Sequence, residues 1–216
     1  MWEESAVSKY PIKRIRTLAL VGQAGSGKTS LAEALLARAG AIAAAGSIER
    51  GSTVCDYTPL EKSFGHSLKL AVASFETQEH RIHLLDTPGY PDFLGHALPA
   101  LAAVETAAIV INAQNGIEMM TGRFMQWAAK RGLDRLVVVN RIDAENVDLP
   151  GLLEKIRQAF GKECLPLNLP AARASKVSDC FFAPSGEADF SSVEEAHKRL
   201  VEQVVEVDEK LMELYL

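Results

Sequence analysis

The sequence predicts an α/β fold with a mostly parallel β-sheet and helices on both faces. Short β-branched or leucine-rich segments alternate along the chain with segments of helical periodicity, which is the order that a parallel sheet requires. The 216 residues are 48% hydrophobic and 24% charged, as in ordinary globular domains. A chain of this length buries enough surface to form a core without disulfides or a structural metal.

Five apolar segments are expected to form the strands. The second and third are separated only by a short polar turn, which predicts an antiparallel hairpin. The others are separated by longer segments that include helices, as parallel neighbours need. The expected strands are residues 17–21, 68–75, 81–85, 106–111 and 135–139.

Two helices follow from apolar periodicity. Leucines share one face of residues 28–38, and Gly40 ends this helix. Residues 119–130 form the second helix, and a further helix is expected around His96. Residues 41–66 show no sustained period, and we expect a long loop there, which in a compact domain is usually functional or disordered.

The character of the sequence changes beyond residue 160. Two prolines interrupt extended pieces, residues 176–182 are a possible strand, and Ser191 or Ser192 caps an amphipathic helix that runs to residue 216. This part is expected to be a small α+β insert subdomain. The expected domains are an N-terminal extension (1–13), a core domain (14–162) and the insert (163–216).

Charge and composition exclude several classes of function. Lys and Arg total 23 against 28 Asp and Glu, a net charge of −5 that argues against sequence-specific DNA binding. No apolar segment approaches the roughly 20 residues that span a bilayer, and residues 1–16 lack the apolar core of a signal peptide. Three widely spaced cysteines fit a reducing compartment. We expect a monomeric cytoplasmic fragment with no membrane partner.

Residues 22–29 match the pattern G-x-x-x-x-G-K-[ST] between a predicted strand and a predicted helix. In such a phosphate-binding loop (P-loop), backbone N–H groups donate to phosphate oxygens, the lysine neutralises the β and γ phosphates, and the Thr hydroxyl binds Mg²⁺. The fold class is therefore that of a P-loop NTPase. The expected nucleotide-binding residues are Gly22, Gln23, Ala24, Gly25, Ser26, Gly27, Lys28 and Thr29.

A second motif follows the predicted strand at 81–85. Asp86 stands at the carboxyl end of that strand, where its carboxylate can reach Mg²⁺ through water. Gly89, three residues later, offers an unhindered backbone N–H to the γ phosphate.

A third motif, Asn140-Arg141-Ile142-Asp143, follows the strand at 135–139. Guanine presents two adjacent N–H donors that one carboxylate accepts together, whereas adenine has an acceptor at N1 and would leave the carboxylate unpaired. We therefore expect Asp143 to select guanine. Asn140 is expected to contact the six-position oxygen of the base or to tether the P-loop.

These three motifs in this order are typical of the GTPase superfamily, and the residues in and around them resemble those of one branch of it. Residues 86–93 (DTPGYPDF) resemble the D-T-P-G-H-x-D-F of translational GTPases. Residues 80–82, 116–118 and 208–216 look like the amino-terminal domain of elongation factor G, and the resemblance covers the chain from about Lys13 onward. It implies a GTP/GDP switch that uses Mg²⁺ and acts on the ribosome as part of a longer protein.

The resemblance also assigns roles, and the chain departs from the family at several of them. Tyr90 stands where the family has a water-positioning His, so we expect slow GTP hydrolysis. Ser67 stands at the position of the Mg²⁺-binding Thr, Gly25 replaces a P-loop Asp, and Arg141 replaces a Lys with a guanidinium that can still stack on the base. These changes resemble elongation factor G-like paralogues. The implied catalytic residues are Lys28, Gly89 and Tyr90, and the implied metal ligands are Thr29, Ser67 and Asp86 (through water).

The family's final strand, which carries Ser-Ala-x against the guanine, is expected beyond residue 216. Ala174-Ser175-Lys176 is rejected as that strand because Pro166 and Pro170 precede it where a central buried strand is needed. His66, beside Ser67, is the one histidine for which we consider a catalytic role.

Two other functions stay open from the residues alone. Tyr90 and Gly25 favour a module that binds nucleotide with little or no turnover and works by docking on a larger assembly. A P-loop ATPase would bind ATP and GTP equally, and Asp143 would then not matter.

Overall fold

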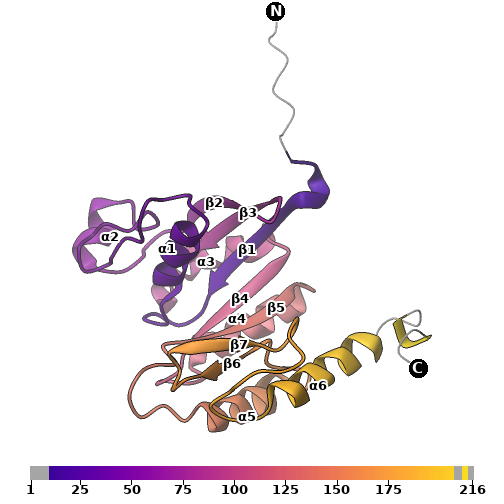
Figure 1. Cartoon of the computed structure of the whole chain (residues 1–216). Helices are drawn as coiled ribbons and strands as arrows, with labels where there is room; N and C mark the ends of the chain where they lie inside the picture. Colours follow the sequence, from indigo (N-terminus) through magenta and orange to yellow (C-terminus); the bar gives the residue numbers. More distant parts are fainter. Residues whose placement is uncertain (1–9, 207–210, 214–216) are drawn as a thin grey trace, which may run out of the picture. The chain divides into compact units, whose positions relative to one another are not determined.

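The computed structural model describes residues 10–206 and 211–213, and these form two compact units (Figure 1). The first unit holds residues 10–112 and 118–140, and the second holds residues 113–117 and those from 141 on. The predicted boundary at residue 162 stays a prediction, and the compact units divide the chain earlier, directly after Asn140.

A five-stranded sheet forms the centre of the first unit, with strand order β2-β3-β1-β4-β5. Strands β3, β1, β4 and β5 are parallel, and β2 pairs antiparallel with β3 as the predicted hairpin. Gln78 and Glu79, both with positive φ, make its two-residue turn. All five predicted strands are present, with shifted ends. They are β1 (Ile15–Val21), β2 (Ala71–Thr77), β3 (His80–Asp86), β4 (Thr106–Asn112) and β5 (Asp134–Asn140).

Helices cover both faces of this sheet, as predicted. Helix α1 (Lys28–Arg38) packs on one face against a core that includes Leu20 and Leu84. Side chains alternate along a strand, so those of Ala19 and Val21, on either side of Leu20, point to the opposite face. Both residues are fully buried there. Helices α3 (Leu94–Ala102) and α4 (Met119–Lys130) contact strands of the sheet as well.

The limits of α1 and α4 are those that the periodicity predicts. His96 lies in α3, also as expected, and its side chain is exposed. Short 3-10 turns precede β1 and α3 at Ile12–Arg14 and Pro91–Phe93.

The loop predicted at 41–66 is wrong in one respect, because it contains helix α2 (Pro59–Phe64). Thr58 and Glu61 form a capping box, in which the Glu61 N–H donates to Thr58 Oγ1 (3.3 Å) and the Thr58 N–H donates to the Glu61 carboxylate (3.0 Å). Gly65 ends the helix with a φ of 68°. Six residues are too few to show a helical period, so only the capping box could have revealed this helix.

The rest of this loop is held to α1 by one buried carboxylate. Glu33 accepts hydrogen bonds from the backbone N–H groups of Gly46 (2.8 Å) and Val54 (2.6 Å). Only 1% of Glu33 is exposed. A buried carboxylate needs hydrogen-bond donors, and here the donors are backbone groups of the loop. The two bonds therefore hold the loop against α1.

The second unit is a small α+β arrangement that includes residues from 141 on, so it is larger than the insert predicted at residues 163–216. Strands β6 (Asn168–Ala171) and β7 (Lys176–Asp179) form an antiparallel pair, and helices α5 (Leu149–Phe160) and α6 (Val193–Glu206) belong to the same unit. Ser192 caps α6, because its hydroxyl accepts the Glu195 N–H (3.3 Å). The core of this unit includes Leu169, Cys180, Val193, Ala196 and Leu200.

Two expectations for this unit need revision. The strand predicted at 176–182 ends at Asp179, whose carboxylate accepts the N–H groups of Phe181 (2.7 Å) and Phe182 (2.9 Å) and so turns the chain. The predicted continuation of the last helix through 207–210 and 214–216 lies outside the described residues. A third expectation agrees with the structure: Ala174 lies in the turn between β6 and β7, outside the five-stranded sheet, as our rejection of residues 174–176 as the guanine-facing strand requires.

In the part of the chain that the structure describes, no helix is both long and apolar enough to cross a membrane. Cys55, Cys164 and Cys180 are all free thiols.

The core predicts a clear stability contrast between two strand residues. Leu84 is fully buried, and Leu84→Ala should lower the free energy of unfolding by roughly 2–5 kcal/mol through lost burial and a residual cavity. Val72→Ala is the control, because Val72 is 64% exposed on the edge strand β2 and should cost less than about 1 kcal/mol. Chemical denaturation measures both, and equal losses would contradict this account of the core.

Candidate nucleotide-binding site

The P-loop adopts a backbone that only glycine accommodates easily. Gly25 and Gly27 have φ values of 75° and 92°. A side chain on Gly22 would collide with the carbonyl oxygen of Val110 in the neighbouring strand β4. Helix α1 begins directly after Gly27, so its unpaired N–H groups end at this loop.

The side chain of Lys28 is buried within the P-loop. Its ammonium donates to the carbonyl oxygens of Gly22 (3.1 Å) and Gln23 (2.8 Å), and 6% of the residue is exposed. Burial lowers the pKa of Lys28 to about 8, although the carboxylates of Asp86 and Glu118 oppose the shift. A weakly solvated cation enclosed by backbone dipoles is well placed to interact strongly with an anion.

Hydroxyl and carboxylate groups from three segments meet at the first turn of α1. The Thr29 hydroxyl donates to Asp86 Oδ2 (2.7 Å), and the Ser67 hydroxyl donates to Asp56 Oδ1 (2.7 Å). The two hydroxyl oxygens lie 3.1 Å apart. Because each hydroxyl has a single hydrogen, donation to the carboxylates leaves both oxygens of this close pair with lone pairs that can accept.

Asp86 carries an oxygen that the described protein does not satisfy. The residue is 1% exposed, and Oδ1 is buried without a hydrogen-bond partner. Burial raises the pKa of Asp86 to about 7, against the opposing effects of the Thr29 hydrogen bond and the Lys28 charge. An unpaired buried carboxylate oxygen is costly, and oxygen donors of this kind are those that Mg²⁺ prefers. The residues therefore fit a Mg²⁺ site.

The second motif lies directly against the P-loop. A Cβ atom on Gly89 would stand 2.5 Å from both the backbone nitrogen of Ala24 and Nζ of Lys28. The Thr87 hydroxyl donates to the Leu20 carbonyl oxygen (2.7 Å) and ties this turn to β1. The close approach leaves room for a glycine and for no larger residue.

Tyr90 continues from Gly89 into a group of four rings. The ring centroids of His66 and Tyr90 are 4.7 Å apart, and those of His66 and Phe93 are 6.1 Å apart. Phe64 stacks on His66 at 5.9 Å. Tyr90 is 42% exposed. The segment before β2 and the turn after β3 thus contact each other through these rings.

Asn140 is a tether of the P-loop. Its side-chain amide donates to the Ser26 carbonyl oxygen (3.0 Å) and contacts Gly27 closely enough that a Cβ there would collide with it. The sequence left open whether Asn140 contacts the base or the P-loop, and in the structure it contacts the P-loop. Arg141, with a φ of 57°, and Asp143 lie in the turn that begins the second unit, and their contact with a base stays a prediction.

The structure thus gathers predicted residues from three segments at the carboxyl ends of β1 and β3. Sequence reasoning missed Asp56, which is 2% exposed and also accepts the Thr53 hydroxyl (3.0 Å). Its only signal was an acid within the segment that we expected to be a functional loop. The predicted residues gathered there are Lys28, Thr29, Ser67, Asp86 and Gly89.

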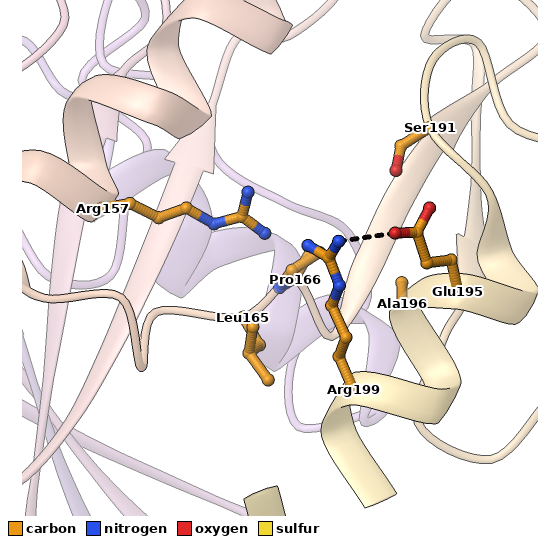
Figure 2. A pocket seen from close by; sticks show the side chains of 7 residues that line it. All are labelled: Arg157, Leu165, Pro166, Ser191, Glu195, Ala196 and Arg199. Carbon is orange, nitrogen blue, oxygen red and sulfur yellow. Dashed lines mark hydrogen bonds and ion pairs between the residues drawn. The ribbon is translucent and has the colours of Figure 1, made fainter. Parts of the chain in front are cut away.

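A separate small cavity lies in the second unit (Figure 2). It has room for about 10 Å³, roughly one water molecule, and Arg157 and Arg199 point into it. Arg199 forms an ion pair (2.5 Å) with Glu195, one turn earlier on the same helix, α6. This cavity is too small for a nucleotide.

The sheet order, the P-loop between β1 and α1, and the adjoining Asp86 and Gly89 define a P-loop nucleotide-binding protein. A family model described as "Elongation factor Tu GTP binding domain" matches residues 13–213. The chain belongs to this family of GTP-binding domains.

Individual relatives agree with this assignment. The chain is 35% identical over 215 residues to the elongation factor G-like protein of Mycobacterium tuberculosis H37Rv, a match that covers 94% of this chain and 30% of that protein. It is 32% identical to the mitochondrial ribosome-releasing factor 2 of Culex quinquefasciatus, over 93% of this chain and 27% of that one. A crystal structure of a Thermus thermophilus protein superposes with a TM-score of 0.83 at 38% identity, covering 94% of this chain and 33% of that one.

The chain therefore spans about a third or less of the length of these relatives. The matched part is the GTP-binding domain that the family model describes.

The contact between Gly89 and the P-loop predicts a specific sensitivity. Gly89→Ala should weaken binding of a non-hydrolysable GTP analogue by about 10-fold or more, because the new methyl group would displace Lys28 and Ala24. Titration with a fluorescent analogue measures this. Gly95→Ala is the control, since no heavy atom lies within 4 Å of a Cβ at that helical position, and it should bind normally. Normal binding by Gly89→Ala would show that the turn does not contact the P-loop in solution.

Proposed function

We propose that the chain is the GTP-binding and GTP-hydrolysing domain of an elongation factor G-like translation factor, in which it acts as a Mg²⁺-dependent switch on the ribosome. One observation supports this above all others: Lys28, Thr29, Ser67, Asp86 and Gly89, from three separate segments, meet in one place. A nucleotide triphosphate with its metal offers the charges and oxygens that such a set would bind.

The P-loop would hold the phosphates. Backbone N–H groups of residues 22–29 face phosphate oxygens in loops of this conformation, and the N-terminus of α1 adds a favourable field. Lys28 would exchange its contacts to Gly22 and Gln23 for the β and γ phosphates. Charge that develops on the phosphates during hydrolysis would then be stabilised by a preformed cation.

Thr29, Ser67 and Asp86 would hold Mg²⁺, the first two directly and Asp86 through water. The support is the pair of hydroxyl oxygens 3.1 Å apart and the unsatisfied Oδ1 of Asp86. When bound, the ion neutralises charge on the β and γ phosphates. Asp56, bonded to Ser67, would fix the direction of that hydroxyl.

The same contacts would make the domain a switch. Ser67 stands at the end of the segment that Glu33 and α2 organise, and Gly89 stands at the start of the turn after β3. Both would contact groups that GTP provides and GDP lacks, so loss of the γ phosphate would release both segments.

Asn140, Arg141 and Asp143 would recognise guanine. Asn140 would hold the P-loop beside the motif, Arg141 would stack on the base, and Asp143 would accept its two N–H donors. The support for these roles is the spacing of the motif and its place directly after β5.

The ribosome is the proposed partner of the full-length protein, on the strength of relatives named elongation factor G-like protein and ribosome-releasing factor 2. We further propose a cytoplasmic monomer that contacts neither a membrane nor specific DNA sequences.

A second candidate function rests on Tyr90. A phenol orients water less well than an imidazole, and Tyr90 is in ring contact with His66. The domain would then bind GTP or GDP and dock without meaningful turnover.

Base selection is tested by changing one carboxylate. Asp143→Asn should weaken GDP binding by about 10- to 100-fold, the cost of losing a charge-assisted hydrogen-bond pair. Competition of GTP and ATP against a fluorescent GDP analogue measures it in the wild type and the variant. Asp134→Asn, at the opposite end of β5, is the matched control and should be neutral. If ATP competes as well as GTP in the wild type, the chain is an ATPase-type P-loop protein instead.

Turnover is tested by phosphate release in a single-turnover assay of the full-length protein, with and without ribosomes. The proposed switch releases phosphate from GTP faster when ribosomes are present. A module that only binds nucleotide releases none under either condition, while it still binds GDP.

A further inference from the structure

His66 lies next to both parts of the proposed γ-phosphate site. It directly precedes Ser67, whose hydroxyl oxygen is 3.1 Å from that of Thr29. Its ring is 4.7 Å, centroid to centroid, from that of Tyr90, which directly follows Gly89. Since Gly89 lies against Lys28, the imidazole is flanked on both sides by groups that would surround the γ phosphate.

The contact of His66 with the backbone of Ser67 favours one tautomer of the neutral ring. Nδ1 lies 3.4 Å from the Ser67 carbonyl oxygen, a long contact in which the oxygen can only accept. Nδ1 therefore carries the hydrogen in this contact. In the neutral ring Nε2 is then an acceptor, and within the described part of the chain it has no hydrogen-bond partner. The ring thus offers a lone pair to a water molecule.

The ring is also held in place. Phe64 stacks on it with an interplanar angle of 22°, and Tyr90 and Phe93 pack against it at tilted angles of 57° and 35°. The residue is half-buried. A group that orients water must keep one position relative to the phosphate. Contacts with three neighbouring rings restrict the motion of the imidazole, although Phe64 (61% exposed) and Tyr90 (42% exposed) lie at the surface.

We propose that His66 is the residue that positions the attacking water in GTP hydrolysis, and that Tyr90 supports its ring. This inference rests on the proposed function. The water oxygen forms a bond to the γ phosphorus while the bond from that phosphorus to the bridging oxygen breaks, and the electron pair stays on GDP. The proton of the water leaves with the phosphate product. His66 accepts a hydrogen bond from the water and aligns it with the bond that breaks.

The test uses the full-length protein with ribosomes and Mg²⁺ in a single-turnover assay. His66→Ala should lower the rate constant of GTP hydrolysis by about 100-fold, the usual scale for loss of a group that acts on the reacting water. Its affinity for a fluorescent GDP analogue should stay within about 2-fold, because Nε2 would not touch the nucleotide. His96→Ala, on the exposed side of α3, is the matched control and should keep the wild-type rate.

A second variant separates chemistry from folding. Tyr90→His in the His66→Ala background returns an imidazole to the adjacent ring position and should recover at least about 10-fold of the lost rate. Since the family has its water-positioning His at position 90, Tyr90→His is also made in the wild-type background, and an equal gain in rate there would overturn the inference.

The results of these assays distinguish failure of this inference from failure of the proposed function. If His66→Ala hydrolyses GTP at the wild-type rate, or loses GDP affinity as much as rate, this inference is overturned and the proposed function stands. If the wild type binds GDP but hydrolyses no GTP with or without ribosomes, both are overturned together.

Discussion

The hydrogen bond from Thr29 to Asp86 is the contact on which the rest of the site depends. It joins the first turn of α1 to the last residue of β3 and brings two buried polar groups together where water is excluded. Ser67 and Asp56 extend it to the segment before β2. A carboxylate with 1% exposure is tolerated only with such partners, so the chemistry of the site and the packing of the sheet edge constrain each other.

The segment at 41–66 shows how a region without regular periodicity can still be specified. Two buried carboxylates order it: Glu33 holds two backbone N–H groups, and Glu61 caps α2 while accepting the N–H groups of Leu68 and Lys69 (both 3.0 Å). Burial acts to raise the pKa of Glu61, but the hydrogen bonds from Thr58, Leu68 and Lys69 together lower it. A segment built on a few polar contacts, rather than on an apolar face, can be released as a unit when those contacts change.

The residues at positions 66, 67 and 90 lie together in space. Taken one at a time, Ser67 and Tyr90 read as weakened versions of the family pattern. In the structure His66 and Tyr90 are in ring contact and Ser67 still reaches Thr29, so the three residues form one local arrangement. The effects of residues in contact are coupled, so these three substitutions are better explained together than one by one.

The sequence by itself determined the five strands of the larger sheet apart from their ends, the limits of α1 and α4, the P-loop and the order of the three motifs, because apolar periodicity and glycine placement are local properties. It did not reveal α2, the role of Asp56 or the contact between His66 and Tyr90. It also did not reveal the hydrogen bond from the Asn140 side chain to the Ser26 carbonyl oxygen. Helix α2 depends on the local capping box of Thr58 and Glu61, whose short span shows no helical period. Only the tertiary structure decided the other points, since the contacts of Ser67 with Thr29, of His66 with Tyr90 and of Asn140 with Ser26 join segments that the chain separates.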